Sequence, residues 1–259
     1  MVCLLLLSRW SGADNLCERI MIIVKKGVDI SKIDFKAGAV ILIDKPLEWT
    51  SFDVVNKLRF ALRRKYGVKK FKVGHNGTLD PLATGLLMIF TGKYTKRIPA
   101  EENHNKRYTG QVKLGATTAT LDREKEETDI REAGHINEIM VKEAMKYFHG
   151  ELEQELPSYS AAKVGGVRMY KLARKDKEVP KKFKNVFFHS SELVSFENPY
   201  VGFDILCGKG TYIRSFARDL GKRLDTSAYL YALRRTEIAN YHVNDAMEVH
   251  EVFDKINPD

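Results

Sequence analysis

The sequence contains little cysteine: its 259 residues include only Cys3, Cys17 and Cys207, whose spacing is typical of neither a metal site nor a disulfide framework. This usage favours a reducing compartment, so we predict a cytoplasmic protein. No run of about 18 apolar residues occurs, which excludes a membrane-spanning helix. None of the seven histidines forms an H-x-H or H-x-x-x-H pair, so we expect no metal site.

Signatures of two other enzyme classes are missing. Residues 208–211 (GKGT) lack the upstream glycine of a Walker phosphate-binding loop, and no G-x-S-x-G elbow of a serine hydrolase occurs. The chain also lacks internal repeats and any linker rich in proline, glycine or serine. With 44% apolar and 30% charged residues, the composition is that of a globular protein with a sizeable core.

Acidic residues are outnumbered, and the formal net charge is +9. The charge is segregated: residues 163–184 hold nine basic and two acidic residues, whereas residues 240–259 hold five acids and one lysine. A basic surface favours a polyanionic partner, most commonly nucleic acid, although solubility alone is the simpler explanation.

The apolar pattern predicts strands intermixed with helices. Residues 39–43 (AVILI) form a short apolar run typical of a buried strand, and Thr50 or Ser51 is placed to cap a helix after it. Alternation predicts strands over 108–114 and 201–207, and helical spacing predicts helices over 136–148 and after Thr211. We therefore predict an α/β (α+β type) fold with a mixed, largely antiparallel central sheet flanked by helices.

Residues 74–85 (GHNGTLDPLATG) are the most unusual segment, because three glycines, a proline and a His/Asp pair lie between apolar stretches. Pro81 favours an extended backbone at Asp80, so a rigid loop presents this carboxylate as an acid, base or nucleophile. The alternative is structural: Asp80 caps a turn and His75 is a core histidine.

The predicted helix after Gly210 carries a second candidate feature. Arg214, Arg218 and Lys222 are four residues apart and form one basic stripe. This stripe and the N–H groups at the start of the helix suit RNA phosphates. The alternative is a solvated face on which Asp219 supplies the counter-charge.

Five motifs together resemble the TruB family of tRNA pseudouridine synthases. The loop at 74–85 is similar to the family signature GHxGTLDPxAxG, and Lys45-Pro46 with Thr50-Ser51 is similar to KPxGxTS, with Glu48 in place of the usual glycine. Three further matches follow in family order: residues 106–108 (KRY), 170–174 (YKLAR), and 209–214 (KGTYIR) with 218–221 (RDLG). Together the matches span residues 38 to about 241.

The resemblance implies isomerisation of a uridine, usually uridine 55 of the tRNA T loop, by breaking N1–C1′ and forming C5–C1′ on a flipped-out base. It implies Asp80 as nucleophile, Arg174 as its ion-pair partner, and Tyr108 as the ring that stacks on the base and assists removal of the C5 proton. The other residues matched to substrate or RNA contacts are His75, Leu172, Lys45, Lys209, Arg214 and Arg218. No metal or organic cofactor is implied.

The resemblance also suggests a domain plan. Residues 1–37 are expected to be an N-terminal extension, with 1–20 disordered or artefactual, and 38–241 the catalytic domain. Residues 242–259 are expected to be a short acidic tail in place of the C-terminal RNA-binding (PUA) domain. Residues 117–150 match a family insertion that orders on RNA.

The expected partner is the tRNA T stem-loop, bound by a monomer without membrane attachment. Three other readings stay open: a synthase for another RNA site, a non-catalytic RNA-binding or RNA-folding protein, and a hydrolase that uses Asp80 as a general base.

Overall fold

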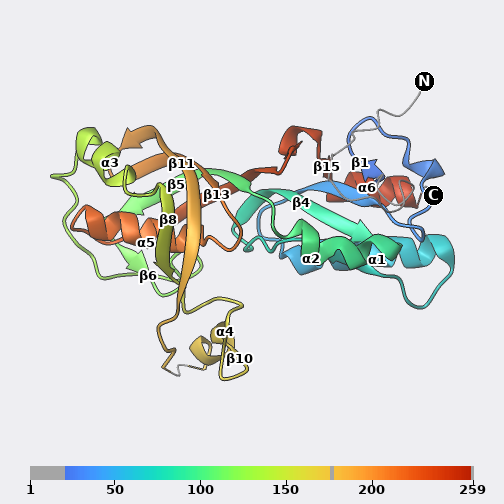
Figure 1. The fold of residues 1–259 in the computed structure, drawn as a ribbon, viewed down its shortest axis with the longest axis horizontal. Helices are drawn as coiled ribbons and strands as arrows, with labels where there is room; N and C mark the ends of the chain where they lie inside the picture. Colours follow the sequence, from blue (N-terminus) through green and yellow to red (C-terminus); the bar gives the residue numbers. More distant parts are fainter. Residues whose placement is uncertain (1–20, 176–177, 258–259) are drawn as a thin grey trace, which may run out of the picture.

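The computed structural model describes residues 21–175 and 178–257, and most of its strands join one long twisted sheet (Figure 1). The sheet order is β1-β2-β4-β13-β5-β12-β11-β8, with β3 and β15 pairing beside β4 and β2, and β14 beside β13. The bounds are β1 Ile23–Val24, β2 Val40–Lys45, β3 Val73–His75, β4 Ala83–Thr91, β5 Lys106–Leu114, β8 Gly150–Glu155, β11 Phe183–Glu197, β12 Tyr200–Cys207, β13 Ala228–Ile238, β14 Tyr241–His242 and β15 Met247–Glu248.

Most neighbouring strands are antiparallel, and the parallel pairs are β1–β2, β4–β13 and β15–β2. The predicted mixed, largely antiparallel sheet is therefore confirmed. Its helices are α1 Ser51–Tyr66, α2 Ile98–Glu101, α3 Glu138–Met145, α4 Met169–Ala173, α5 Ile213–Arg223 and α6 Val249–Ile256. Two small hairpins complete the strands: β6 Thr117–Thr118 with β7 Glu127–Thr128, and β9 Lys163–Val164 with β10 Val167–Arg168.

The predicted strand at 39–43 and the helix after it form as expected. All five residues of the apolar run are fully buried, and Val40 to Ile43 lie within β2. Thr50 caps α1 in a capping box: its hydroxyl accepts from the N–H of Asp53, and the Asp53 carboxylate accepts from the N–H of Thr50. The helix ends at Gly67, whose left-handed backbone (φ 60°) a side chain would disfavour.

The helix predicted after Gly210 begins slightly later than its sequence suggests. Tyr212, and not Thr211, occupies the N-cap position of α5, and the Gln154 side chain accepts from the N–H of Tyr212. The Thr211 hydroxyl instead donates to the carbonyl of Gly208. The free N–H at the start of α5 is thus bonded by a side chain from β8, and not by the neighbouring Thr211.

Three hydrophobic clusters lie along the sheet; the smallest includes Val40, Leu86 and Phe90, and the two larger ones each surround a helix. One surrounds α5 and includes Phe203, Phe216 and Leu220; the other surrounds α1 and includes Ile41, Leu58 and Val252. We call them the α5 core and the α1 core. Figure 1 shows α5 and α1 at opposite ends of the sheet, with β4 and β13 between them.

The structure contradicts the predicted acidic tail at 242–259. Within this segment β15 pairs with β2, and α6 packs against α1 through Val249, Val252 and Ile256, each at most 2% exposed. The apolar spacing of these three residues makes one face of a helix, which acidic residues elsewhere in the segment obscured. The predicted extension also reaches into the fold, because β1 pairs with β2 and Phe35 is fully buried. The expectation for residues 1–20 lies outside the described residues.

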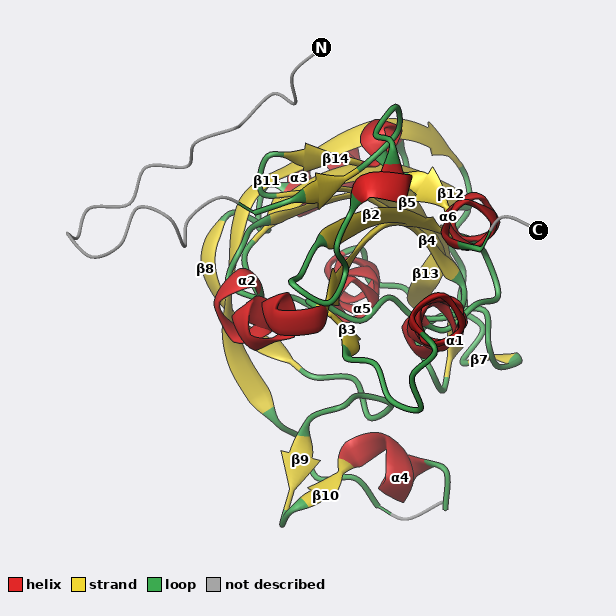
Figure 2. Cartoon of the chain, turned by 90° about the vertical axis from the view of Figure 1, so that its right-hand side faces the viewer, coloured by secondary structure: helices red, strands yellow, loops and turns green. Residues whose placement is uncertain are grey.

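Residues 163–175, which carry much of the basic segment, project from the body of the molecule between β8 and β11. They contain the hairpin β9–β10 and α4, which Figures 1 and 2 both show standing away from the sheet. By contrast, the segment at 117–150, expected to order on RNA, packs on the α5 core through Val141, Met145 and Phe148.

Candidate active site

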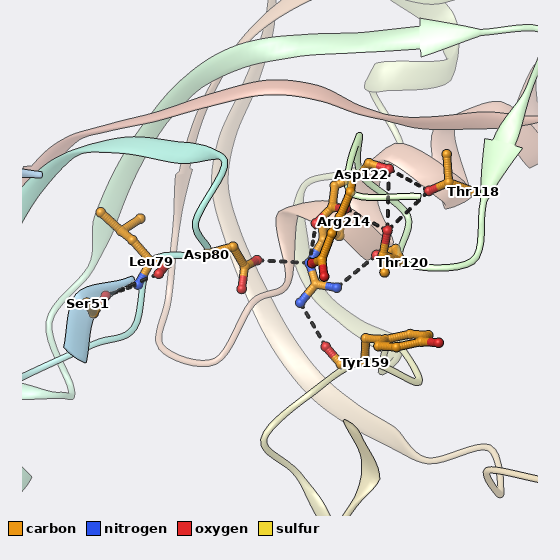
Figure 3. Close-up of polar contacts among 9 residues, drawn as sticks. Ser51, Leu79, Asp80, Thr118, Thr120, Asp122, Tyr159 and Arg214 are labelled. Carbon is orange, nitrogen blue, oxygen red and sulfur yellow. Dashed lines mark hydrogen bonds and ion pairs between the residues drawn. The ribbon is translucent and has the colours of Figure 1, made fainter. Parts of the chain in front are cut away.

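The loop that carries Asp80 connects β3 to β4, and the first residue of α1 anchors it. The Ser51 hydroxyl donates to the carbonyl of Leu79 (3.1 Å) and accepts from its N–H (2.8 Å), as Figure 3 shows. Leu79 is 3% exposed, and the N–H of Ala83 donates to the carbonyl of Asp80. The loop is therefore anchored on both sides of a carboxylate that is itself partly exposed, with a side chain 39% accessible.

Arg214, at the start of α5, is the ion-pair partner of Asp80. Its Nε lies 2.9 Å from Asp80 Oδ2, and its two terminal nitrogens donate to the carbonyls of Thr120 (2.8 Å) and Tyr159 (3.0 Å) (Figure 3). The whole residue is only 7% exposed. The planar guanidinium is thus fixed by three separate segments of the chain, which aims its charge at the Asp80 carboxylate.

A second carboxylate, Asp122, lies behind Arg214 and was missed by sequence reasoning. Its Oδ2 is 3.8 Å from Arg214 Nε, and its Oδ1 accepts from the Thr120 hydroxyl (2.6 Å) and the Glu124 N–H (3.0 Å). Asp122 is 7% exposed, and its carbonyl accepts from Thr118. The signal was present as the alternation of Thr118, Thr120 and Asp122, but nothing local linked it to Arg214.

The structure does not place Arg174 beside Asp80, the position that the family resemblance implies for it. Arg174 is an exposed residue at the end of α4, and its guanidinium lies over the Tyr170 ring at 5.6 Å. The partner position belongs to Arg214, whose spacing predicts a place on an RNA-binding stripe. Each of these arginines is the last residue of a short motif, so the motifs alone do not tell which one lies beside Asp80. The position of α5 next to the loop decides it.

The stripe predicted along α5 is not a solvated basic face. The side chain of Arg218 is 16% exposed and pairs with Asp219 (2.8 Å) and Glu155 (3.8 Å), while Lys222 is 60% exposed and lies near the same two carboxylates. Arg214 is turned toward Asp80. Two of the three cations are therefore used inside the protein, which contradicts their expected role as RNA contacts.

Lys45 is also wrongly predicted to contact RNA, because it is 0% exposed. Its ammonium donates to the carbonyls of Pro46 (2.8 Å), Trp49 (2.6 Å) and Pro81 (3.4 Å). It thus ties the end of β2 to the loop just after Asp80. Burial lowers the pKa of Lys45 to about 8.

Two more buried cations lie near the loop that carries Asp80. Arg235, on β13, is 1% exposed and donates to the carbonyls of Leu86 (2.7 Å) and Gly77 (3.2 Å). Lys106, at the start of β5, is 7% exposed, and burial followed by the charge of Arg235 lowers its pKa to about 8. Arg235 thus holds the loop through the Gly77 carbonyl, whereas the Lys106 ammonium donates to the carbonyls of Glu102 (3.2 Å) and His104 (2.7 Å). The sequence indicated neither contact.

Tyr108 lies on β5 in the α5 core with 8% exposure. Burial raises the pKa of its hydroxyl, which the neighbouring Arg235 partly opposes. His75 is half-buried at the end of β3, where its Nδ1 accepts from the N–H of Gly77 (3.2 Å), and burial lowers the pKa of its imidazole. Both residues are therefore neutral at pH 7.

The two remaining predicted residues lie away from this network. Leu172 is half-buried on α4 in the projecting segment. Lys209 is exposed after β12, and its ammonium donates to the Asn103 side chain (2.6 Å). Within residues 21–175 and 178–257, no group of three or more His, Cys, Asp or Glu side chains is arranged to hold a metal ion.

The sequence and fold of the chain can be compared with those of known proteins. A family model described as "TruB family pseudouridylate synthase (N terminal domain)" matches residues 63–213, which include Asp80 and Tyr108. The chain is 45% identical over 217 residues to tRNA pseudouridine synthase B of Flavobacterium johnsoniae, covering 83% of this chain and 95% of that protein. It is 47% identical to tRNA pseudouridine synthase B of Phocaeicola vulgatus, covering 84% and 92%.

The chain belongs to the TruB family of pseudouridylate synthases. This synthase also resembles a chain in a crystal structure of a Cbf5–Nop10–Gar1 complex, with a TM-score of 0.64 and 26% identity. That match covers 88% of the synthase and 58% of the other chain, so the synthase spans little more than half of that protein's length. The mixed sheet described above is thus the pseudouridine synthase fold.

Proposed function

We propose that this enzyme converts uridine to pseudouridine in tRNA, at position 55 of the T loop, with Asp80 as nucleophile. The observation that carries the proposal is the Asp80–Arg214 pair: a partly exposed carboxylate on an anchored loop, 2.9 Å from a buried guanidinium. The relatives named tRNA pseudouridine synthase B match nearly their whole length to this chain, which supports tRNA as the substrate class.

The reaction can be written with this chain's own residues. A carboxylate oxygen of Asp80 bonds to C1′ while the N1–C1′ bond breaks, and the uracil leaves with the electron pair. The base then turns so that C5 attacks C1′ and displaces Asp80, after which the C5 proton is lost and N1 is protonated. Atoms and charge balance, because the N1–C1′ bond is replaced by a C5–C1′ bond and the proton lost from C5 is matched by the proton gained at N1.

Arg214 takes the role expected of Arg174. Its fixed charge keeps Asp80 ionised and aimed before the base arrives, so little reorganisation is needed during the reaction. Asp122, Thr120 and Tyr159 act through Arg214 by fixing its plane.

Tyr108 supplies a ring for the flipped base to stack on. Because burial raises the pKa of its hydroxyl, the Tyr108 phenol stays protonated at pH 7. For Tyr108 to assist removal of the C5 proton, the bound base must change the surroundings of this hydroxyl so that its pKa falls. Flipping the base costs a few kcal/mol, which contacts to the rest of the RNA offset.

His75, Leu172 and Lys209 remain proposed RNA contacts, since each is at least partly accessible. We propose that the enzyme acts as a monomer in the cytoplasm. None of the helices in the described part of the chain is long and apolar enough to cross a membrane.

The decisive test is conversion of uridine 55 in an unmodified tRNA transcript, read by carbodiimide labelling and primer extension. Wild type should give one stop at position 55, and Asp80→Asn should bind the transcript but give none, because the amide is neither charged nor nucleophilic. A transcript with cytidine at that position is the matched control.

Other outcomes separate the alternatives. A stop at a different uridine would identify another RNA site. Tight binding by wild type without any stop would indicate an RNA-binding protein, and conversion by Asp80→Asn would refute the nucleophile.

A further inference from the structure

A groove of about 430 Å³ lies beside the end of β4, and it is lined by lysines that the catalytic site does not use. The five are Lys36, Lys70, Lys72, Lys93 and Lys96, and all are exposed. Val68, Phe71 and Gly92 complete the lining. The groove therefore has a partly apolar floor and a cationic rim.

Backbone hydrogen bonds fix the three segments that carry these lysines. The N–H of Gly92 donates to the carbonyl of Lys72 (3.0 Å), and the N–H of Lys93 donates to that of Lys36 (3.3 Å). Gly92 has a φ of +53°, and a Cβ there would stand 2.3 Å from the Lys36 carbonyl oxygen. Only glycine permits the backbone at position 92 to come so close to the backbone of Lys36. Backbone contacts therefore fix the spacing of the lysines on the rim.

The positive charge of the rim is largely uncompensated within the described part of the chain. Lys70, Lys72, Lys93 and Lys96 have no carboxylate within ion-pair distance there, whereas Asp34 lies near Lys36 and accepts from its N–H (2.9 Å). The adjoining residues 57–72 add to the field, because they contain eight basic residues and no acid. Like charges held together without counter-ions favour a polyanion as ligand.

The groove is remote from Asp80 but connected to it by one strand. Asp80 lies just before β4 (Ala83–Thr91) and the groove just after it, so nine residues of extended chain separate them by about 27 Å. In Figure 1, β4 runs from the middle of the molecule toward the end where α1 finishes. A ligand that fills both places must be long, which a nucleic acid helix is and a nucleotide is not.

We propose that this lysine groove binds the sugar–phosphate backbone of the RNA helix that leads away from the target uridine. The inference rests on the proposed function, since it takes the substrate to be RNA. The contact adds affinity without reading sequence, because phosphates are the same at every position.

The test compares Lys70→Ala/Lys93→Ala/Lys96→Ala with wild type in binding to two hairpins carrying the same T loop. One hairpin has a short stem, and the other has a stem long enough to span about 27 Å. The variant should bind the long hairpin about tenfold more weakly, with a log K against log salt slope smaller by roughly two to three. Lys26→Ala/Lys255→Ala, two exposed lysines that do not line the groove, is the control.

The outcomes distinguish the two proposals. An equal loss on both hairpins would refute a remote contact, and an unchanged affinity and salt slope on the long hairpin would show that the groove serves some other partner, such as an acidic protein. If wild type binds and converts neither hairpin nor tRNA, the proposed function fails instead. Circular dichroism melts of each variant exclude misfolding as the cause.

Discussion

Replacing Arg214 by lysine tests the central contact of the site. Lysine keeps the positive charge but has a single ammonium, which cannot reach Asp80, the Thr120 carbonyl and the Tyr159 carbonyl together from the position of a guanidinium. Losing one preorganised charged contact at a reacting group costs about 10²–10³ in rate, or roughly 3–4 kcal/mol. We therefore expect kcat to fall by this factor while RNA affinity changes little, because Arg214 is 7% exposed.

Single-turnover conversion of the tRNA transcript at saturating enzyme gives the rate, and filter binding gives the affinity. Arg174→Ala serves as the companion variant and should retain kcat, because its guanidinium lies over Tyr170 and not beside Asp80. The reasoning would be refuted if Arg214→Lys kept most of its kcat while Arg174→Ala lost it. A loss of affinity and salt dependence in Arg214→Lys, with kcat retained, would restore the RNA-contact assignment.

Two further predictions concern stability. Because burial lowers the pKa of Lys45 to about 8, between about pH 8 and 10 the unfolded chain binds a proton that the folded chain does not, and the free energy of unfolding should rise by up to about 2 kcal/mol. Urea titrations at both ends of this range should show a smaller rise for Lys45→Met, whereas equal rises would mean that Lys45 does not titrate. Gly85→Ala should cost about 3 kcal/mol or more, because Gly85 has a φ of +105° and a Cβ would stand 2.2 Å from the Arg235 carbonyl. Thermal unfolding measures it against Gly134→Ala, where nothing lies within 4 Å, and equal melting temperatures would contradict the argument.

The local elements were predictable where one segment carried the whole signal. The buried strand β2, the Thr50 cap of α1 and the alternating strands β5 and β12 formed as the sequence predicted. The helix α6 was missed because five acids among residues 240–259 suggested a solvated tail, while three apolar residues on one face were enough to pack it against α1.

The site divides in the same way. Asp80 could be singled out because its proline, glycines and histidine lie within one loop, and the family resemblance gave it a role. The partner of Asp80 could not be read from a motif, since Arg174 and Arg214 both close short segments with an arginine. Burial reversed three other assignments, because Lys45, Arg214 and Arg218 use their charges on groups inside the protein.

The sequence alone therefore determined the family, the sheet-forming segments and the loop that presents the carboxylate, because each depends on residues close together in the chain. Tertiary structure alone decided which cations face Asp80, which are buried and which remain exposed. Those outcomes depend on segments as far apart as Asp80 and Arg214, or Lys36 and Lys93, that meet only when the sheet has formed. Charge is a property of a residue, but its partner is a property of the fold.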